Sequence, residues 1–140
     1  MAAGQMLDIE AETAGASSVD TIIRIQSHKP GALFRFACEA GAILAGAERT
    51  PLRKYADDIG LAFQITDDLL DMDSSAEQLG KATQKDVKRG KATIVSLTGR
   101  EAARAKARSL VASAVAALGV YGQRAEILSD AARFIMLRKR

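Results

Sequence analysis

The chain has few of the residues that mark secreted or membrane-spanning proteins. Cys38 is the single cysteine among 140 residues, which argues against a disulfide framework or a thiolate metal cage and favours a cytoplasmic setting. Tryptophan is absent and aromatic residues make up 4%, so stacking on nucleic-acid bases has little support. No apolar run reaches the roughly 20 residues that cross a bilayer, and the beginning of the chain does not have the pattern of a signal peptide.

What is present indicates one helical domain over residues 1–140. Hydrophobic residues make up 48% of the chain, which is enough for a packed core, and there are only two prolines. Apolar residues recur at helical spacing and no segment has the pattern of a strand, so we expect an all-α fold. We predict helices near 5–14, 21–29, 32–47, 50–72, 92–98, 100–118 and 123–137, with a structured polar loop over 73–92.

The charges are unevenly distributed along the chain. Every charged residue from Asp67 to Glu77 is acidic, whereas from Lys81 to Arg108 nine basic residues face only two acidic ones. This order is expected where a metal bridges an anionic ligand to the protein; a solvated surface of paired charges is the alternative. A nucleic-acid partner is not expected, because the acidic block would repel phosphate unless a metal were present.

The acidic block begins inside a segment that otherwise reads as buried. At the helical period, Gln64, Asp67, Asp68 and Asp71 fall on about a quarter-turn of one helix, and apolar residues occupy the rest. Carboxylates this close repel one another unless a cation neutralises them. Mg²⁺ is commonly held by one or two carboxylates together with waters and substrate phosphates. A metal site is therefore predicted, with a solvated acidic face as the alternative.

The next segment, GKATQKDVKRGKAT, adds groups suited to phosphate. Lys81, Lys85 and Lys91 provide compact mobile charges, and Gly80 and Gly90 allow close approach of the backbone. The spacing does not match a P-loop, and no strand precedes it. Together, the stripe and this loop suggest a diphosphate held between Mg²⁺ and ammonium groups.

These residues resemble the trans-polyprenyl diphosphate synthases, the family of farnesyl and geranylgeranyl diphosphate synthases. FQITDDLLD at 63–71 and the loop at 80–93 are similar to the second aspartate-rich motif of that family and the loop after it. GQMLDIEAE at 4–12, HKPGALFRFACEAGAILAGA at 28–47 and the ending FIMLRKR at 134–140 resemble further family segments in the same order.

The resemblance implies an all-α isoprenoid-synthase bundle around a central cavity and a head-to-tail prenyl transfer. The substrates would be isopentenyl diphosphate and an allylic diphosphate, and the cofactor Mg²⁺. It implies that Asp67 and Asp71 bind the metal and that Asp68 supports them, all three counting as catalytic, while Gln64 lines the same face.

The resemblance also implies a diphosphate-binding set that lies outside this stripe. The lysines expected to contact the allylic diphosphate are Lys29, Lys81 and Lys91, of which the first two are also counted as catalytic. Asp86 would orient lysines or metal-bound waters, and Gln5 and Asp8 would lie at the cavity wall. One local departure is Pro30, which stands where the family has threonine, so that a hydroxyl is missing beside Lys29.

The larger departure is that the family's first aspartate-rich motif has no counterpart in this chain. The 140 residues therefore resemble the C-terminal half of such an enzyme, and alone they would be incomplete and inactive. We expect a homodimer, or assembly with an N-terminal half or a full-length synthase. A non-catalytic truncated homologue that regulates a full-length synthase is the alternative.

Overall fold

The chain is all-helical wherever the computed structural model describes it, which is over residues 2–14, 18–79 and 92–138. No strand occurs in these ranges, and this confirms the predicted all-α class. The helices are α1 (Ala2–Ala14), α2 (Val19–His28), α3 (Pro30–Leu44), α4 (Thr50–Leu79), α5 (Ile94–Thr98), α6 (Arg100–Ala117) and α7 (Glu126–Leu137), with the 3₁₀ segment η1 (Leu118–Ala125) before α7. In this part of the chain no helix is both long and apolar enough to cross a membrane.

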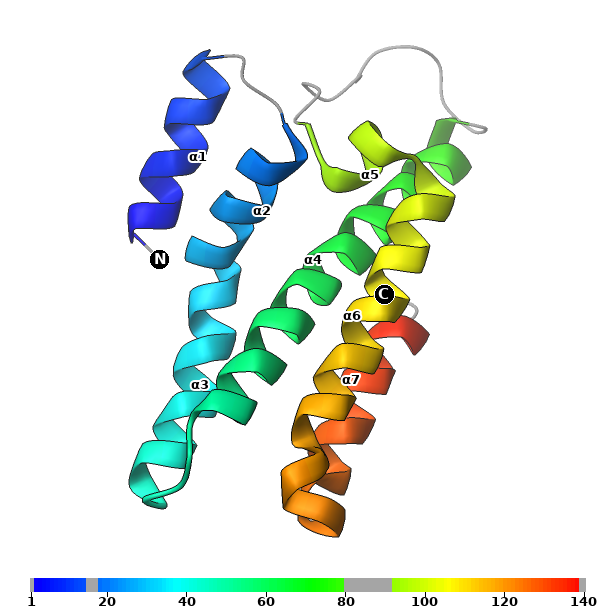
Figure 1. Ribbon diagram of the computed structural model, residues 1–140. Helices are drawn as coiled ribbons and strands as arrows, with labels where there is room; N and C mark the ends of the chain where they lie inside the picture. Colours follow the sequence, from blue (N-terminus) through cyan, green and yellow to red (C-terminus); the bar gives the residue numbers. More distant parts are fainter. Residues whose placement is uncertain (1, 15–17, 80–91, 139–140) are drawn as a thin grey trace.

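The long helix α4 is the centre of the arrangement. Figure 1 shows it running diagonally between α3 on one side and α6 on the other, with α1 at the outer edge. Its buried residues contribute to two apolar clusters. Tyr55 and Ile59 pack with side chains of α6 and α7, and Ile65 and Leu69 pack with side chains of α2, α5 and α6. Asp67 and Asp71 of α4 belong to neither cluster.

Small residues let α6 approach α4 closely. Ala103, Ala107 and Ala114 are fully buried on one side of α6, at helical spacing. Burial of this apolar surface is the main force that holds the two helices together.

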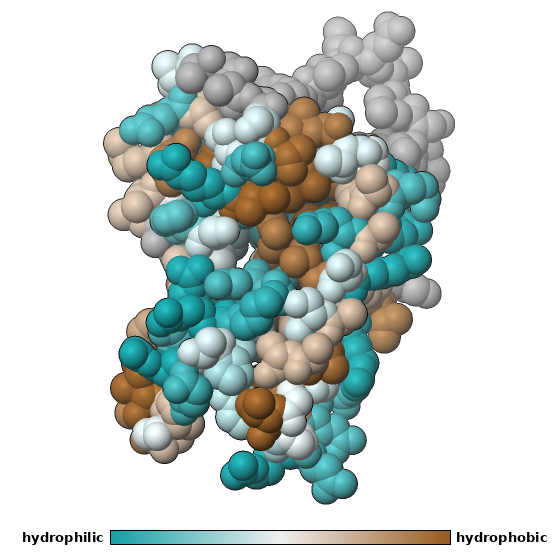
Figure 2. Space-filling model, in the orientation of Figure 1, coloured by the Kyte–Doolittle hydropathy of each residue, from teal (hydrophilic) through white to brown (hydrophobic). Residues whose placement is uncertain are grey.

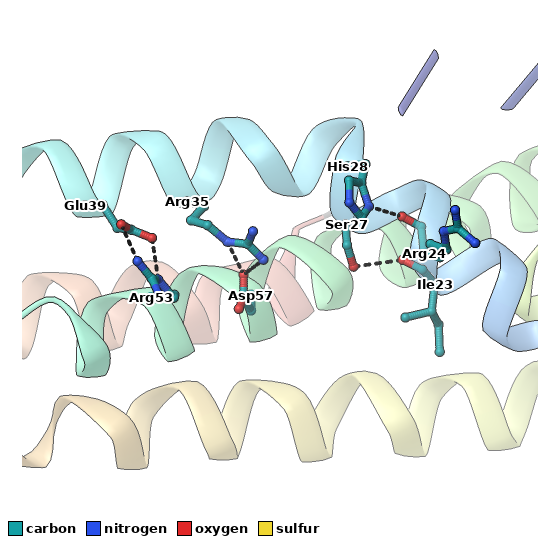
Figure 3. A network of polar contacts seen from close by, with 8 residues as sticks. All are labelled: Ile23, Arg24, Ser27, His28, Arg35, Glu39, Arg53 and Asp57. Atoms are coloured by element: carbon teal, nitrogen blue, oxygen red, sulfur yellow. Dashed lines mark hydrogen bonds and ion pairs between the residues drawn. The ribbon is translucent and has the colours of Figure 1, made fainter. Parts of the chain in front are cut away.

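Ion pairs join α3 to α4 across their outer surface. Figure 3 shows Arg35 on α3 reaching Asp57 on α4, with Nη2 2.7 Å from Oδ1, and Arg53 on α4 reaching Glu39, with Nε 2.7 Å from Oε1. Both pairs lie at or near the surface, where such contacts contribute about 0.2–1 kcal/mol each. They therefore set the register of α3 on α4 more than they stabilise the packing.

Helices α2 and α4 begin in different ways. Ser18 caps α2, accepting a hydrogen bond from the Thr21 amide at 3.1 Å. Thr50 is already part of α4, and its hydroxyl donates to Glu48 Oε1 at 2.6 Å.

The predicted loop over 73–92 is wrong in its first part, because α4 continues to Leu79. The polar residues of DMDSSAEQL suggested a loop, but alanine, glutamate, glutamine and leucine are good helix formers, and the first strong helix breaker after Met72 is Gly80. The carboxylates at 67–71 therefore lie well inside a helix and are not at its end.

Candidate active site

The acidic stripe lies on the face of α4 that is turned away from the core. The Asp67 side chain is 51% exposed and Asp71 is exposed, whereas Ile65 and Leu69 on the packed face are 0% and 4% exposed. Asp68 and Gln64 are half-buried at its edge. Exposure removes the large cost of desolvating several carboxylates, so the stripe needs no permanent metal to be compatible with folding.

Asp67 has an internal counter-charge. The Arg138 guanidinium donates from Nη2 to Asp67 Oδ1 at 3.0 Å and to the backbone carbonyl of Phe63 at 3.1 Å. Its Cζ lies 4.0 Å from the centre of the Phe63 ring, which is a cation–π contact. Phe63 in turn packs against Phe34 of α3, with ring centres 5.6 Å apart. The last described residue of the chain is thus anchored one turn before the first carboxylate of the motif.

Lys29 stands at the break between α2 and α3 and is paired with Asp8 of α1. The ammonium lies 2.7 Å from Asp8 Oδ2; the lysine side chain is 34% exposed and the aspartate 6%. The buried carboxylate fixes one side of the ammonium and leaves the other side accessible. Lys29 and Asp67 do not form an ion pair with each other. Lys29 is paired with Asp8, and Asp67 is paired with Arg138.

Gly4 makes the Lys29–Asp8 contact possible. A Cβ on Gly4 would lie 2.4 Å from the carbonyl carbon of His28 and 2.5 Å from the Lys29 nitrogen. These are backbone atoms that cannot move aside, so only glycine lets α1 lie this close. Asp8 follows one helical turn later on the same face, which carries its carboxylate to the Lys29 side chain.

The stripe suits Mg²⁺ as a partial ligand set. No group of three or more histidine, cysteine, aspartate or glutamate side chains converges on one point within the described ranges. Asp67 and Asp71, however, lie one turn apart on a single exposed face, and oxygen ligands are those that Mg²⁺ prefers. Two carboxylates that leave most positions to water and phosphate match its usual binding in phosphate-processing sites.

The other predicted residues have mixed outcomes. Gln5 is exposed on α1. His28 is exposed at the end of α2, and its Nδ1 lies 2.9 Å from the Arg24 carbonyl (Figure 3). Cys38 is half-buried against the core, and burial raises the pKa of its thiol. The predictions for the loop residues Lys81, Lys85, Asp86 and Lys91 lie outside the described residues.

Arg138 is the site residue that sequence reasoning missed. The basic ending FIMLRKR was noted, but Arg138 and Asp67 are 71 positions apart and nothing in the local pattern pairs them. The available signal was the presence of both a basic segment at 138–140 and an acidic stripe at 67–71 in one chain.

Fold and site together define a class: an all-helical protein whose central helix presents carboxylates to solvent and whose α2–α3 junction holds a partly exposed lysine oriented by Asp8. The comparisons with known proteins agree with this description. The family model for polyprenyl synthetase matches residues 1–126. The chain belongs to the polyprenyl synthetase family.

Three relatives illustrate the match. A dimethylallyltranstransferase from Fischerella ambigua is 40% identical over 141 residues, covering 99% of this chain and 41% of the relative. The farnesyl diphosphate synthase of Escherichia coli is 44% identical over 115 residues, covering 79% and 38%. The crystal structure of an FPP/GFPP synthase from Zymomonas mobilis superposes with a TM-score of 0.81 at 44% identity, covering 96% and 45%. The chain therefore spans less than half the length of these relatives.

Proposed function

We propose that the chain forms the metal- and diphosphate-binding face of a prenyltransferase. The proposed reaction is the head-to-tail condensation of isopentenyl diphosphate with an allylic diphosphate, giving a short polyprenyl diphosphate such as farnesyl or geranylgeranyl diphosphate. The observation that carries the proposal is the exposed pair Asp67 and Asp71 on one face of α4. The names of relatives such as the Escherichia coli farnesyl diphosphate synthase support the substrate class.

In this proposal the residues of the chain bind and orient the leaving group. Asp67 and Asp71 would hold Mg²⁺, with Asp68 in support; when bound, Mg²⁺ would neutralise charge that develops on the departing diphosphate. Lys29 would donate to a diphosphate oxygen from the open side of its ammonium, while Asp8 keeps the ammonium in place. Gln64 would line the same face, and Lys81, Asp86, Lys91 and Gln5 remain predicted substrate contacts.

The remaining parts of the catalytic machinery would come from elsewhere. We propose that the central cavity is completed by an N-terminal half, a full-length synthase or a second copy of this chain. A cytoplasmic setting is part of the proposal and is supported by Cys38, which is a free thiol.

The test is calorimetric binding of an unreactive allylic diphosphate analogue, with Mg²⁺ and again with EDTA. We expect binding that requires Mg²⁺ and that Asp67→Ala reduces at least about tenfold, since one of two metal-binding carboxylates is lost. The matched control is Asp130→Ala, which removes an exposed carboxylate of α7. Analogue binding that ignores both EDTA and Asp67→Ala would contradict the proposal. An absence of binding under every condition would favour the alternative of a non-catalytic partner of a full-length synthase.

A further inference from the structure

We propose that Arg138 is an internal substitute for the metal at Asp67. Its guanidinium neutralises the carboxylate while no divalent cation is bound, and it leaves Asp67 when the cation arrives. Arg138 would thereby lower the affinity of the acidic stripe for the metal, and its position would depend on whether the metal is bound. This inference rests on the proposed function, because it assumes that Asp67 is a metal ligand.

The contacts of Arg138 show that the guanidinium is placed specifically at this carboxylate. Nη2 is shared between Asp67 Oδ1 and the Phe63 carbonyl, and the planar group covers the Phe63 ring at 4.0 Å. The arginine side chain is only 18% exposed. By contrast, Arg133 on the same helix is 57% exposed and pairs with Asp130 three positions away. Arg138 is therefore docked on α4, whereas Arg133 lies along its own helix.

The same geometry makes the docked position easy to leave. Nε of Arg138 is buried and has no hydrogen-bond partner. A buried donor without a partner is costly, and this donor would regain water once the side chain moved away. Asp67 is half exposed, so the ion pair itself is screened by solvent.

A divalent cation and the guanidinium cannot both occupy this place without penalty. Nη2 lies 3.0 Å from Asp67 Oδ1, so a cation bound to that carboxylate would lie a few ångströms from a positive charge. At such distances like charges repel one another even where solvent screens them in part. Mg²⁺ has the higher charge and a strong preference for carboxylate oxygen, so it should displace the arginine.

The experiment is a Mg²⁺ titration of the whole chain in the presence of inorganic diphosphate, followed in two ways. Calorimetry gives the affinity, and nitrogen–proton NMR follows the side-chain Nε–H signal of Arg138, which is assigned by its loss in Arg138→Lys. Arg138→Met removes the charge and keeps an unbranched side chain over Phe63. Arg133→Met is the matched control on the same helix.

We expect Arg138→Met to bind Mg²⁺ about three- to tenfold more tightly than the wild type, because the competing cation is gone. Arg133→Met should change the affinity less than about twofold, since its charge is solvated and paired with Asp130. In the wild type, the Arg138 Nε–H signal should shift with Mg²⁺ and reach its limit at the calorimetric midpoint.

Equal or weaker Mg²⁺ affinity in Arg138→Met, or an Nε–H signal that does not move, would overturn the inference. If Mg²⁺ binding still depended on Asp67 in that case, the proposed function would be unaffected. Absence of Mg²⁺ binding in the wild type and in Arg138→Met alike would remove both proposals. Binding that appears only in Arg138→Met would support the inference strongly.

Discussion

Tyr55 shows how one side chain connects the central helix α4 to α7 near the end of the chain. It is 1% exposed on α4, and its hydroxyl donates to the Leu128 carbonyl of α7 at 2.7 Å. Burial raises the pKa of Tyr55 from 10.0 to about 12. Since α7 leads to Arg138, this bond helps to place the guanidinium relative to Asp67.

The raised pKa of Tyr55 predicts a loss of stability in strong alkali. The contribution of the protonated hydroxyl is complete below the unfolded pKa of 10.0 and is lost as the pH rises through about 12. Tyr55→Phe should cost about 1 kcal/mol of unfolding free energy at neutral pH. It should also make the unfolding free energy fall less steeply between these two pH values. Urea unfolding measured from pH 7 to 12 would show both effects.

The matched control for this prediction is Tyr121→Phe. The Tyr121 hydroxyl donates to the Glu48 carbonyl at 3.0 Å at an exposed site, so its removal should cost about 0.5 kcal/mol or less at neutral pH. An equal loss of unfolding free energy at neutral pH in the two variants would show that the buried hydrogen bond of Tyr55 stabilises the fold no more than the exposed one of Tyr121.

At the residue scale, the sequence predicted the exposed face of the aspartate stripe better than the ion-pair partners of the candidate site residues. The exposure of the Asp67 stripe follows from helical periodicity alone, because the apolar residues of the segment must take the other face. The pairing of Lys29 with Asp8 and of Arg138 with Asp67 depends on how distant helices pack. Such contacts are set by tertiary structure and leave no local pattern.

At the scale of elements, α1 is positioned by a single close approach. Gly4 lies against the backbone at the junction of α2 and α3, and this contact lets Asp8 reach Lys29. A helix with a side chain at position 4 would have to lie farther out. The lysine would then lose the carboxylate that orients it.

Gly4→Ala should therefore displace α1 and weaken diphosphate binding. We expect a loss of about 1–3 kcal/mol in unfolding free energy, typical of overpacking against a fixed backbone, together with lower affinity for the diphosphate analogue. Gly41→Ala is the matched control: it lies inside α3 with nothing within 4 Å of the new Cβ, so it should stabilise the chain by about 0.5–1 kcal/mol. Thermal unfolding of the two variants should shift in opposite directions, and shifts of the same sign would contradict this account of Gly4.

The predicted helices were correct in order, and the errors concern their ends. α4 continues past Met72 because its polar residues are also helix formers. The last predicted helix began at 123, but η1 occupies 118–125 with a kink inside it at Gly122, where φ is 56°, and α7 begins only at Glu126. A glycine predicts a break only approximately, because its conformational freedom permits several kinds of turn.

At the scale of the whole molecule, the described surface carries several large apolar side chains. On α3, Leu33, Phe36, Ile43 and Leu44 are 53–89% exposed. Figure 2 shows an apolar patch at the lower end of that helix. Exposed apolar surface of this extent commonly marks a site of association.

We predict that the isolated chain self-associates at micromolar concentrations. Light scattering after size-exclusion chromatography should give a mass above 14.9 kDa, and Phe36→Asp should lower that mass by replacing an exposed apolar side chain of α3 with a charge. Gln123→Asp, at an exposed polar position of η1, is the matched control and should leave it unchanged. A monomer at all concentrations would show that α3 does not mediate association of this chain.

The position of α1 has a consequence for the order in which the molecule opens. Among the described helices α1 contacts only α2, whereas α4 contacts every described element except α1. Parts with few neighbours open most readily without global unfolding, so amide hydrogens of α1 should exchange first and those in the middle of α4 last. Each such opening would separate Asp8 from Lys29. Lys29 would thus lose the carboxylate that orients it whenever α1 opens. The carboxylates of α4 would keep their positions, because they lie on the most protected helix.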